Sequence, residues 1–170
     1  MPNARHILAP FVPTPSDVVD RMLLLAAISD TDVVYDLGCG DGRVVIAAAK
    51  NYGARGVGID IEPHWVEQSR ANAQAAGVSA LAQFEHQDAL SVDLASATVI
   101  TLYLVDWSMQ LLAPLLLDHA PPGARVVSHN YAFAGWKPAH KEAFTDAQGN
   151  PHTLYLWRVG SDARSLPGPV

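Results

Sequence analysis

The sequence predicts an α/β fold whose sheet is mostly parallel and doubly wound, and closes with an antiparallel hairpin. Strand-like apolar runs alternate with helix-like segments through most of the chain, as they do when crossover helices connect parallel strands. A turn containing three alternating glycines follows the first of these runs. The last two strand-like runs are joined instead by a short loop rich in turn-forming residues, 146–151, which predicts the hairpin.

The composition fits one globular domain with a sizeable core. Of the 170 residues, 49% are apolar and 16% are charged. The formal net charge is −6 and the isoelectric point is about 5.5. Because nucleic-acid phosphates bind to clustered lysines and arginines, we expect no nucleic-acid partner. A basic partner, such as a lysine side chain, suits this charge.

Cysteine content and hydrophobicity bear on the expected location. Cys39 is the only cysteine, so an internal disulfide and a paired-cysteine zinc site are both excluded. The sequence contains no apolar run long enough for a membrane span. Residues 1–10 lack the apolar segment of a secretory signal. We therefore expect a cytoplasmic protein, although removal of a leader peptide would leave the same sequence. The oligomeric state is not predicted.

The amino-terminal segment is expected to be extended. Residues 10–15 contain three prolines, each of which restricts its own backbone and that of the preceding residue. Thr14 is the expected N-cap of a first helix that starts with Pro15 and ends near residue 28. We expect residues 1–14 to lie over a ligand site, where Phe11 supplies apolar cover and Thr14 a hydroxyl.

The body of the domain is expected to span residues 15–160. Its predicted strands are 33–36, 57–60, 80–86, 97–104, 125–131, 142–144 and 153–159, and the helices between them are 43–51, 63–76 and 107–119. Pro114 is expected to kink or split the last helix. Little room remains for a helix between the fifth and sixth strands. Residues 161–170, rich in proline and glycine, are expected to form a loose tail.

The glycine turn indicates which kind of ligand binds. It reads Asp36-Leu-Gly-Cys-Gly-Asp-Gly-Arg43, whereas a pyrophosphate-binding turn has the spacing G-x-G-x-x-G. Glycines allow a ligand to lie directly on the backbone. The carboxylates of Asp36 and Asp41 repel phosphate and suit a cation. S-adenosylmethionine (SAM) carries an ammonium and a sulfonium but no phosphate, so we expect SAM as the cofactor.

Acids follow three successive strands, at Asp36, Asp60 and Asp88. The carboxyl ends of parallel strands meet at one edge of a sheet, where open α/β sheets bind ligands. Asp60 can accept both hydroxyls of a ribose, and Ile61 can pack on an adenine. Asp88 can accept from the adenine amino group while the Ala89 N–H donates to the ring. The methionine portion would be held by the turn, through the following residues: Asp36, Gly38, Cys39 and Gly40.

The octapeptide 36–43 resembles the first motif of class I SAM-dependent methyltransferases. The resemblance extends over about residues 10–136 and includes Gly56-Val-Gly-Ile-Asp60, Thr101-Leu-Tyr-Leu104 and Gly123-Ala-Arg-Val-Val-Ser128. Together these segments resemble one methyltransferase group, which includes the mitochondrial lysine methyltransferases of the adenine nucleotide translocase and the ATP synthase c-subunit, with bacterial relatives. This resemblance implies a Rossmann-like, seven-stranded class I methyltransferase fold and the cofactor roles given above. It also implies a protein lysine as methyl acceptor.

The candidate catalytic residues follow the fourth and fifth strands and are Tyr103, Asp106 and His129. Methylation of nucleic-acid bases is disfavoured because the Asn/Asp-Pro-Pro-Tyr/Phe motif is missing after the fourth strand. Small-molecule N- or O-methylation is one alternative. A metal-assisted form of it would use Asp106, His129 and Asn130, although we predict no metal site. A SAM-binding module without methyl transfer is the other alternative.

Overall fold

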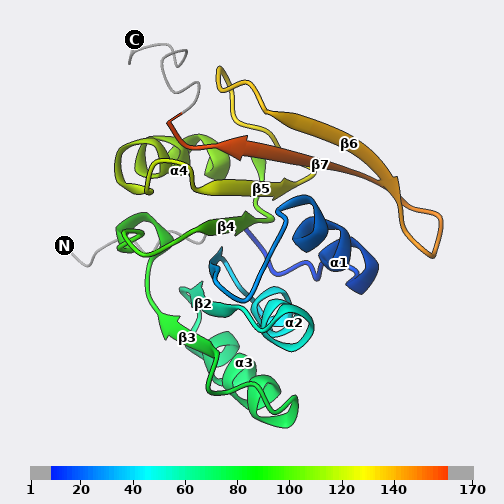
Figure 1. Ribbon diagram of the computed structural model, residues 1–170, viewed down its shortest axis with the longest axis vertical. Helices are drawn as coiled ribbons and strands as arrows, with labels where there is room; N and C mark the ends of the chain where they lie inside the picture. The colour runs from blue at the N-terminus through cyan, green and yellow to red at the C-terminus, as the bar shows by residue number, and fades with distance from the viewer. Residues whose placement is uncertain (1–8, 161–170) are drawn as a thin grey trace.

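The computed structural model describes residues 9–160, which form a seven-stranded sheet with helices on both faces (Figure 1). The elements in chain order are α1 (Ser16–Leu25), β1 (Val33–Leu37), α2 (Arg43–Tyr52), β2 (Arg55–Asp60), α3 (Pro63–Ala75), β3 (Ala82–His86), the 3₁₀ helix η1 (Ala89–Ser91), β4 (Val99–Leu102), α4 (Asp106–His119), β5 (Arg125–His129), β6 (His140–Thr145) and β7 (Pro151–Arg158). The expectations for residues 1–8 and for the tail 161–170 lie outside the described residues.

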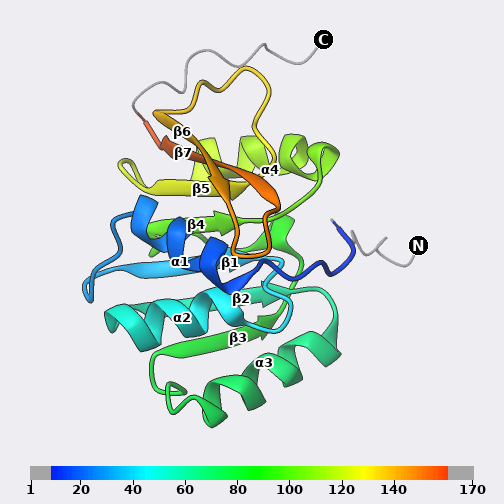
Figure 2. The same cartoon turned by 90° about the vertical axis from the view of Figure 1, so that its right-hand side faces the viewer.

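The strands are ordered β3-β2-β1-β4-β5-β7-β6 (Figure 2). Neighbours among β1 to β5 pair in parallel, and β7 runs antiparallel to both β5 and β6. The predicted fold class is therefore confirmed, including the closing hairpin. Because the five parallel strands point the same way, the loops that follow them meet at one edge of the sheet.

Two layers of apolar side chains hold the helices against the sheet. On one face, α1 and α2 pack on Val34, Val99 and Val127, and α2 and α3 pack around Phe84. On the other face, α4 packs on residues such as Ile100, and Figure 1 shows α4 across the sheet from α1 and α2. All four residues of β4 are buried, as expected for a central strand covered on both faces.

The start and the end of α1 differ from the prediction. Thr14 is not its N-cap: Pro15 occupies that position, and no side chain caps the helix. The Thr14 carbonyl instead accepts from Arg43 Nη1 at 2.8 Å, and its hydroxyl lies 3.5 Å from His129 Nδ1. The helix ends at Leu25, three residues early, because Ala27 has a positive φ of 52°.

Of the two expected effects of Pro114, a kink or a split of the last helix, the split does not occur. Residues Asp106–His119 form one α-helix with Pro114 inside it. Packing against the sheet supports this helix, since Met109, Leu112 and Leu116 are fully buried. Within residues 9–160, neither α4 nor any other helix combines the length and the apolar character needed to cross a bilayer.

A loop takes the place of a helix between β5 and β6, as predicted. β5 stops at His129 because Asn130 has a φ of 66°. The loop covers the sheet with aromatic side chains: the Phe133 and Trp136 rings lie 4.8 and 5.9 Å from that of Trp157. The Trp157 indole N–H donates to the Trp136 carbonyl at 2.9 Å. Because this connection is a loop, it adds no helix at the carboxyl ends of the central strands.

Candidate functional site

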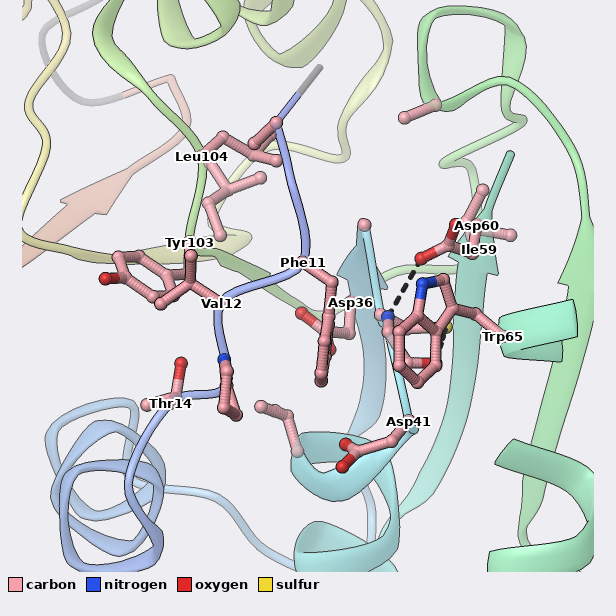
Figure 3. A pocket seen from close by; sticks show the side chains of 18 of the residues that line it. Phe11, Val12, Thr14, Asp36, Asp41, Ile59, Asp60, Trp65, Tyr103 and Leu104 are labelled. Carbon is pink, nitrogen blue, oxygen red and sulfur yellow. Dashed lines mark hydrogen bonds between the residues drawn. The ribbon is translucent and has the colours of Figure 1, made fainter. Parts of the chain in front are cut away.

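A cavity of about 210 Å³ lies where β1, β2 and β4 end (Figure 3). The glycine turn and the end of β2 form its floor, residues after β3 and β4 form its sides, and residues 9–14 cover it. The residues predicted for the site that line it are Thr14, Asp36, Gly38, Cys39, Gly40, Asp60, Ile61, Ala89 and Tyr103. Asp88, Asp106 and His129 lie outside this wall.

Hydrogen bonds to the end of β2 hold the glycine turn in place. The N–H groups of Gly38 and Cys39 donate to the Ile59 carbonyl at 2.8 and 2.9 Å. Gly40 N–H donates to Asp60 Oδ2 at 2.9 Å. Gly40 has a φ of 54°, and a Cβ at this position would overlap the Phe11 ring. The position therefore requires glycine both for its conformation and for the close contact above it.

Asp60 combines a structural bond with spare acceptor capacity. Oδ2 accepts from Gly40 N–H, and Oδ1 accepts from Glu62 N–H at 3.0 Å. A carboxylate oxygen has two lone pairs, so each oxygen can accept a further hydrogen bond. Asp60 can thus hold two neighbouring hydroxyls, such as those of a ribose, while it fixes the turn.

Asp36 is a buried acid at the centre of the cavity wall. Thr101 Oγ1 donates to its Oδ1 at 2.8 Å from the neighbouring strand. Burial raises the pKa of Asp36 to about 7, the Thr101 bond opposes this, and the carboxylates of Asp60 and Asp41 add to it. A cation in the cavity would favour the ionised form of Asp36.

Asp41 has a different role from the one its sequence position indicates. Arg43 forms a bidentate ion pair with it, with Nη2 2.6 Å from Oδ2 and Nε 3.0 Å from Oδ1. This pairing raises the pKa of Arg43. Because Arg43 also binds the Thr14 carbonyl, Asp41 and Arg43 fasten the amino-terminal segment to the turn. Among the acids of the glycine turn and the strand ends, Asp36 and Asp60 are therefore available to a cationic ligand, and Glu62 also lines the cavity.

The cover of the cavity is built around Phe11. Its ring lies 4.0 Å from that of Trp65, centroid to centroid, and against Gly40 (Figure 3). The sequence places Trp65 on one face of α3 but does not connect it with the site. No local signal relates residue 11 to residue 65, because their contact depends on how the segment crosses the sheet edge.

The predicted residues outside the wall have distinct environments. Asp88 accepts from Leu90 N–H at 2.9 Å and caps η1, while its neighbours Gln87 and Ala89 line the cavity. Its contact with adenine stays a prediction. Asp106 is exposed at the first residue of α4.

His129 is buried, and its ring lies 4.0 Å from that of Tyr103. Burial and the nearby His152 lower the pKa of His129 to about 4. Burial raises the pKa of Tyr103, and Tyr131 adds to this effect. Both side chains are therefore neutral at pH 7. His152, whose Nδ1 lies 2.7 Å from His129 Nε2, carried no recognisable signal in the sequence.

The residues of the metal-assisted alternative do not form a site. In the part of the chain that the structure describes, no three histidine, cysteine, aspartate or glutamate side chains group around a common point. Asp106 is exposed, whereas His129 is buried and faces Thr14 and His152. Asn130 accepts from Thr153 N–H at 2.9 Å.

The thiol of Cys39 is expected to be inert in the folded protein. Cys39 is buried, and burial together with Asp36 and Asp60 raises the pKa of its thiol. Since the thiolate is the reactive form, Ellman's reagent at pH 8 should label no thiol in the native protein. The same reagent in guanidinium chloride should label one. Rapid labelling of the native protein would contradict this and favour a redox role.

Comparison with known proteins identifies similar chains. The family model described as the ANTKMT methyltransferase domain matches residues 36–140. The protein-lysine N-methyltransferase of Saccharolobus islandicus is 42% identical over 153 residues, which cover 89% of this chain and 94% of that protein. The mouse lysine N-methyltransferase of the ATP synthase c-subunit is 35% identical over 139 residues. These residues cover 82% of this chain but only 56% of the mouse protein.

A solved structure resembles the whole described fold. It is the crystal structure of an RNA methyltransferase from Salinibacter ruber in complex with S-adenosyl-L-homocysteine. That chain is 46% identical in sequence, and the TM-score is 0.84. The match covers 93% of this chain and 98% of the Salinibacter chain. The similarity therefore includes the strand ends that form the cavity.

Proposed function

The chain belongs to the ANTKMT methyltransferase family and is a SAM-dependent methyltransferase, and we propose that its methyl acceptor is the side-chain amine of a protein lysine. The observation that carries this proposal is the 42% identity to a protein-lysine N-methyltransferase over 94% of that protein's length. The acid-lined cavity supplies the matching chemistry for the cofactor.

The cavity suits SAM because its acids match the polar groups of that molecule. When bound, SAM supplies an activated methyl group for transfer to a nucleophile. Asp60 would hold the ribose hydroxyls with its remaining lone pairs, and Asp36 would face the positive charge of the methionine end. Because Gly40 has no Cβ, the Phe11 ring can lie directly on the glycine turn and cover the cavity.

The aromatic residues beside the cavity suit a lysine side chain. Tyr103 lines the cavity, and its pKa is influenced by Tyr131, which follows β5. Aromatic rings pack on the methylene groups of lysine and attract its ammonium. Because Tyr103 retains its proton near neutral pH, it serves as a wall and hydrogen-bond donor rather than as the base.

RNA is a second candidate acceptor, because the Salinibacter protein is called an RNA methyltransferase. Two observations favour lysine over RNA. The net charge of −6 disfavours a phosphate backbone. The residues after β4, Tyr103-Leu-Val-Asp-Trp107, do not contain the Asn/Asp-Pro-Pro-Tyr/Phe motif of base methylation.

The test is methylation of a cell lysate with tritium-labelled SAM. We expect the label to appear in protein, to survive ribonuclease, to disappear on proteinase treatment, and to be recovered as methyl-lysine after acid hydrolysis. The matched control is the Asp60→Ala variant, which should transfer far less label because it binds the cofactor weakly.

The other outcomes identify the alternatives. If ribonuclease removes the label, the methyl acceptor is RNA and the lysine proposal is wrong. Label confined to the small-molecule fraction would establish a small-molecule methyltransferase. If calorimetry shows SAM binding but no fraction contains labelled product, the protein is a SAM-binding module without methyl transfer.

A further inference from the structure

A chain of four polar side chains leads from the cavity to the hairpin. Thr14 Oγ1, on the cavity wall, lies 3.5 Å from His129 Nδ1. His129 Nε2 lies 2.7 Å from His152 Nδ1, and His152 Nε2 lies 2.9 Å from Asp146 Oδ2. The four residues come from the amino-terminal segment, β5, β7 and the turn between β6 and β7. The three-dimensional fold alone brings them into line.

Three of the four side chains are shielded from water, and His152 is partly buried. Thr14 and Asp146 are each 6% exposed, and His129 is 1% exposed. Buried polar groups are costly unless they are hydrogen-bonded, and here every neighbouring pair is within reach. The 3.5 Å separation between Thr14 and His129 is the longest link, and catalytic hydrogen bonds often shorten only when substrate is bound.

The donors around Asp146 fix the direction of these hydrogen bonds. The carboxylate accepts from the backbone N–H groups of Gln148 and Asn150 and from the Asn150 amide. The His152 bond and these bonds lower the pKa of Asp146 to about 2, so it is ionised and His152 Nε2 must donate to it.

The remaining donors follow from this first one. When His152 is neutral, with its proton on Nε2, its Nδ1 is an acceptor, and His129 Nε2 then donates to it. His129 Nδ1 is then an acceptor, and the Thr14 hydroxyl donates to it. The lone pairs of Thr14 Oγ1 therefore remain for the cavity, where the hydroxyl points toward Tyr103 (Figure 3).

We propose that Thr14, His129, His152 and Asp146 form a relay that removes a proton from the lysine ammonium before methyl transfer. This inference rests on the proposed lysine acceptor. The ammonium gives a proton to Thr14 Oγ1, which passes its own proton to His129 Nδ1. His129 passes its Nε2 proton to His152 Nδ1. The transferred charge ends on His152 as an imidazolium paired with the Asp146 carboxylate.

The neutral amine then has the lone pair that the reaction needs. Lysine Nζ attacks the methyl carbon, an N–C bond forms, and the S–C bond breaks with its electron pair left on sulfur. One proton has moved to the relay, and the products are a methylated ammonium and S-adenosylhomocysteine. His129 does not retain the proton, because burial and His152 lower its pKa to about 4.

The titratable groups around the two imidazoles fit this direction of transfer. The Tyr103 ring lies 4.0 Å from that of His129 at an interplanar angle of 35°, and the raised pKa of Tyr103 keeps it neutral. Tyr131, which follows β5, contributes to the raised pKa of Tyr103. On the hairpin side lie Asp146 and, from α1, Asp17, whose Oδ2 accepts from Ala147 N–H at 2.6 Å. Asp146, which accepts from His152 Nε2, stabilises a positive charge on His152 rather than on His129.

The arrangement is tested first without substrate, by ¹⁵N NMR of the histidine rings in the uniformly labelled protein at pH 7.5. We expect His129 and His152 each to carry the proton on Nε2, with an unprotonated Nδ1. Substituting His129 and His152 one at a time with glutamine assigns the signals. A proton on Nδ1 of His129 would mean that the hydrogen bonds run in the opposite direction, and this result would overturn the proposal.

The kinetic test uses His152→Gln, which keeps a donor for Asp146 but cannot carry the proton. The wild type and the variant are compared on the protein band that the lysate experiment labels. At pH 7 we expect kcat to fall about 100-fold, as for loss of a general base. The loss should shrink as the pH is raised toward about 10, because free lysine then loses its own proton. A merely structural defect would not recover in this way.

The matched control is His140→Gln, a histidine on the same hairpin that pairs with Glu142 at the surface, and it should leave kcat unchanged. SAM affinity and Tm of His152→Gln should match those of the wild type. If wild-type enzyme methylates lysine and His152→Gln retains the same kcat and pH profile, the relay is overturned and the proposed function stands. If wild-type enzyme methylates no lysine, both are overturned.

Discussion

Replacing Asp60 with alanine is expected to weaken SAM binding at least about 100-fold. The variant loses a carboxylate that accepts from Gly40 and Glu62 and can accept both ribose hydroxyls. Hydrogen bonds to a charged group contribute about 1.5–3 kcal/mol each, and a factor of ten in affinity corresponds to about 1.4 kcal/mol. Loss of two such bonds therefore exceeds two factors of ten. Titration calorimetry with SAM and S-adenosylhomocysteine measures the effect.

The control for Asp60→Ala is Asp93→Ala. Asp93 is an exposed acid that accepts from Ala95 N–H and lies away from the cavity wall, so its loss should leave the affinity unchanged. Tm of both variants is measured to show that they fold. A folded Asp60→Ala variant that binds SAM with wild-type affinity would refute the assignment of the ribose site to the end of β2.

Replacing Asp36 with asparagine is expected to stabilise the ligand-free protein at pH 8 and to weaken SAM binding. The pKa of Asp36 is raised by burial to about 7 in the folded protein and is about 3.9 in an unfolded chain. At a pH between these two pKa values, the Asp36 carboxyl is ionised in the unfolded chain but still protonated in the folded protein. The free energy of unfolding therefore falls as the pH rises from about 4 to about 7, by up to about 4 kcal/mol. Asparagine retains the acceptor for Thr101 without this cost.

SAM affinity should have the opposite pH dependence. A cationic ligand favours the carboxylate form, so wild-type affinity should increase with pH up to about 7, and binding below about pH 7 should release a proton. Calorimetry in two buffers of different ionisation enthalpy measures that proton. The Asp36→Asn variant should show neither effect. If wild type and variant differ in stability by the same amount at pH 4 and pH 8, the buried acid does not titrate as described.

Together the two acids indicate how the site gains affinity for a positively charged ligand. Asp60 is held by backbone donors and is ready to accept hydroxyls. Asp36 is kept in a poorly solvated position that the ligand-free protein tolerates at a cost in stability. The guanidinium of Arg43 pairs with Asp41. It therefore does not compete with a cationic ligand for Asp36. A buried acid of this kind is common at functional sites.

Local patterns in the chain were sufficient to predict the fold class, the order of the elements and the location of the glycine turn. These patterns are hydrophobic periodicity, the spacing of Gly38, Gly40 and Gly42, and turn residues near Asn150. Boundaries were less well predicted, because positive φ values at Ala27 and Asn130 end their elements without any glycine to mark them. Most of the predicted cofactor-binding residues line the cavity, since parallel strands must end at one edge.

How residues distant in the chain meet depends on the tertiary structure. Thr14 is a wall residue beside His129 rather than a helix cap, because Arg43 and the sheet edge position the amino-terminal segment. Asp41 is paired rather than available. The alignment of His129 with His152 exists because β7 inserts between β5 and β6. Strand order arises from packing over the whole sheet, and no local pattern in the sequence encodes which side chains it places together.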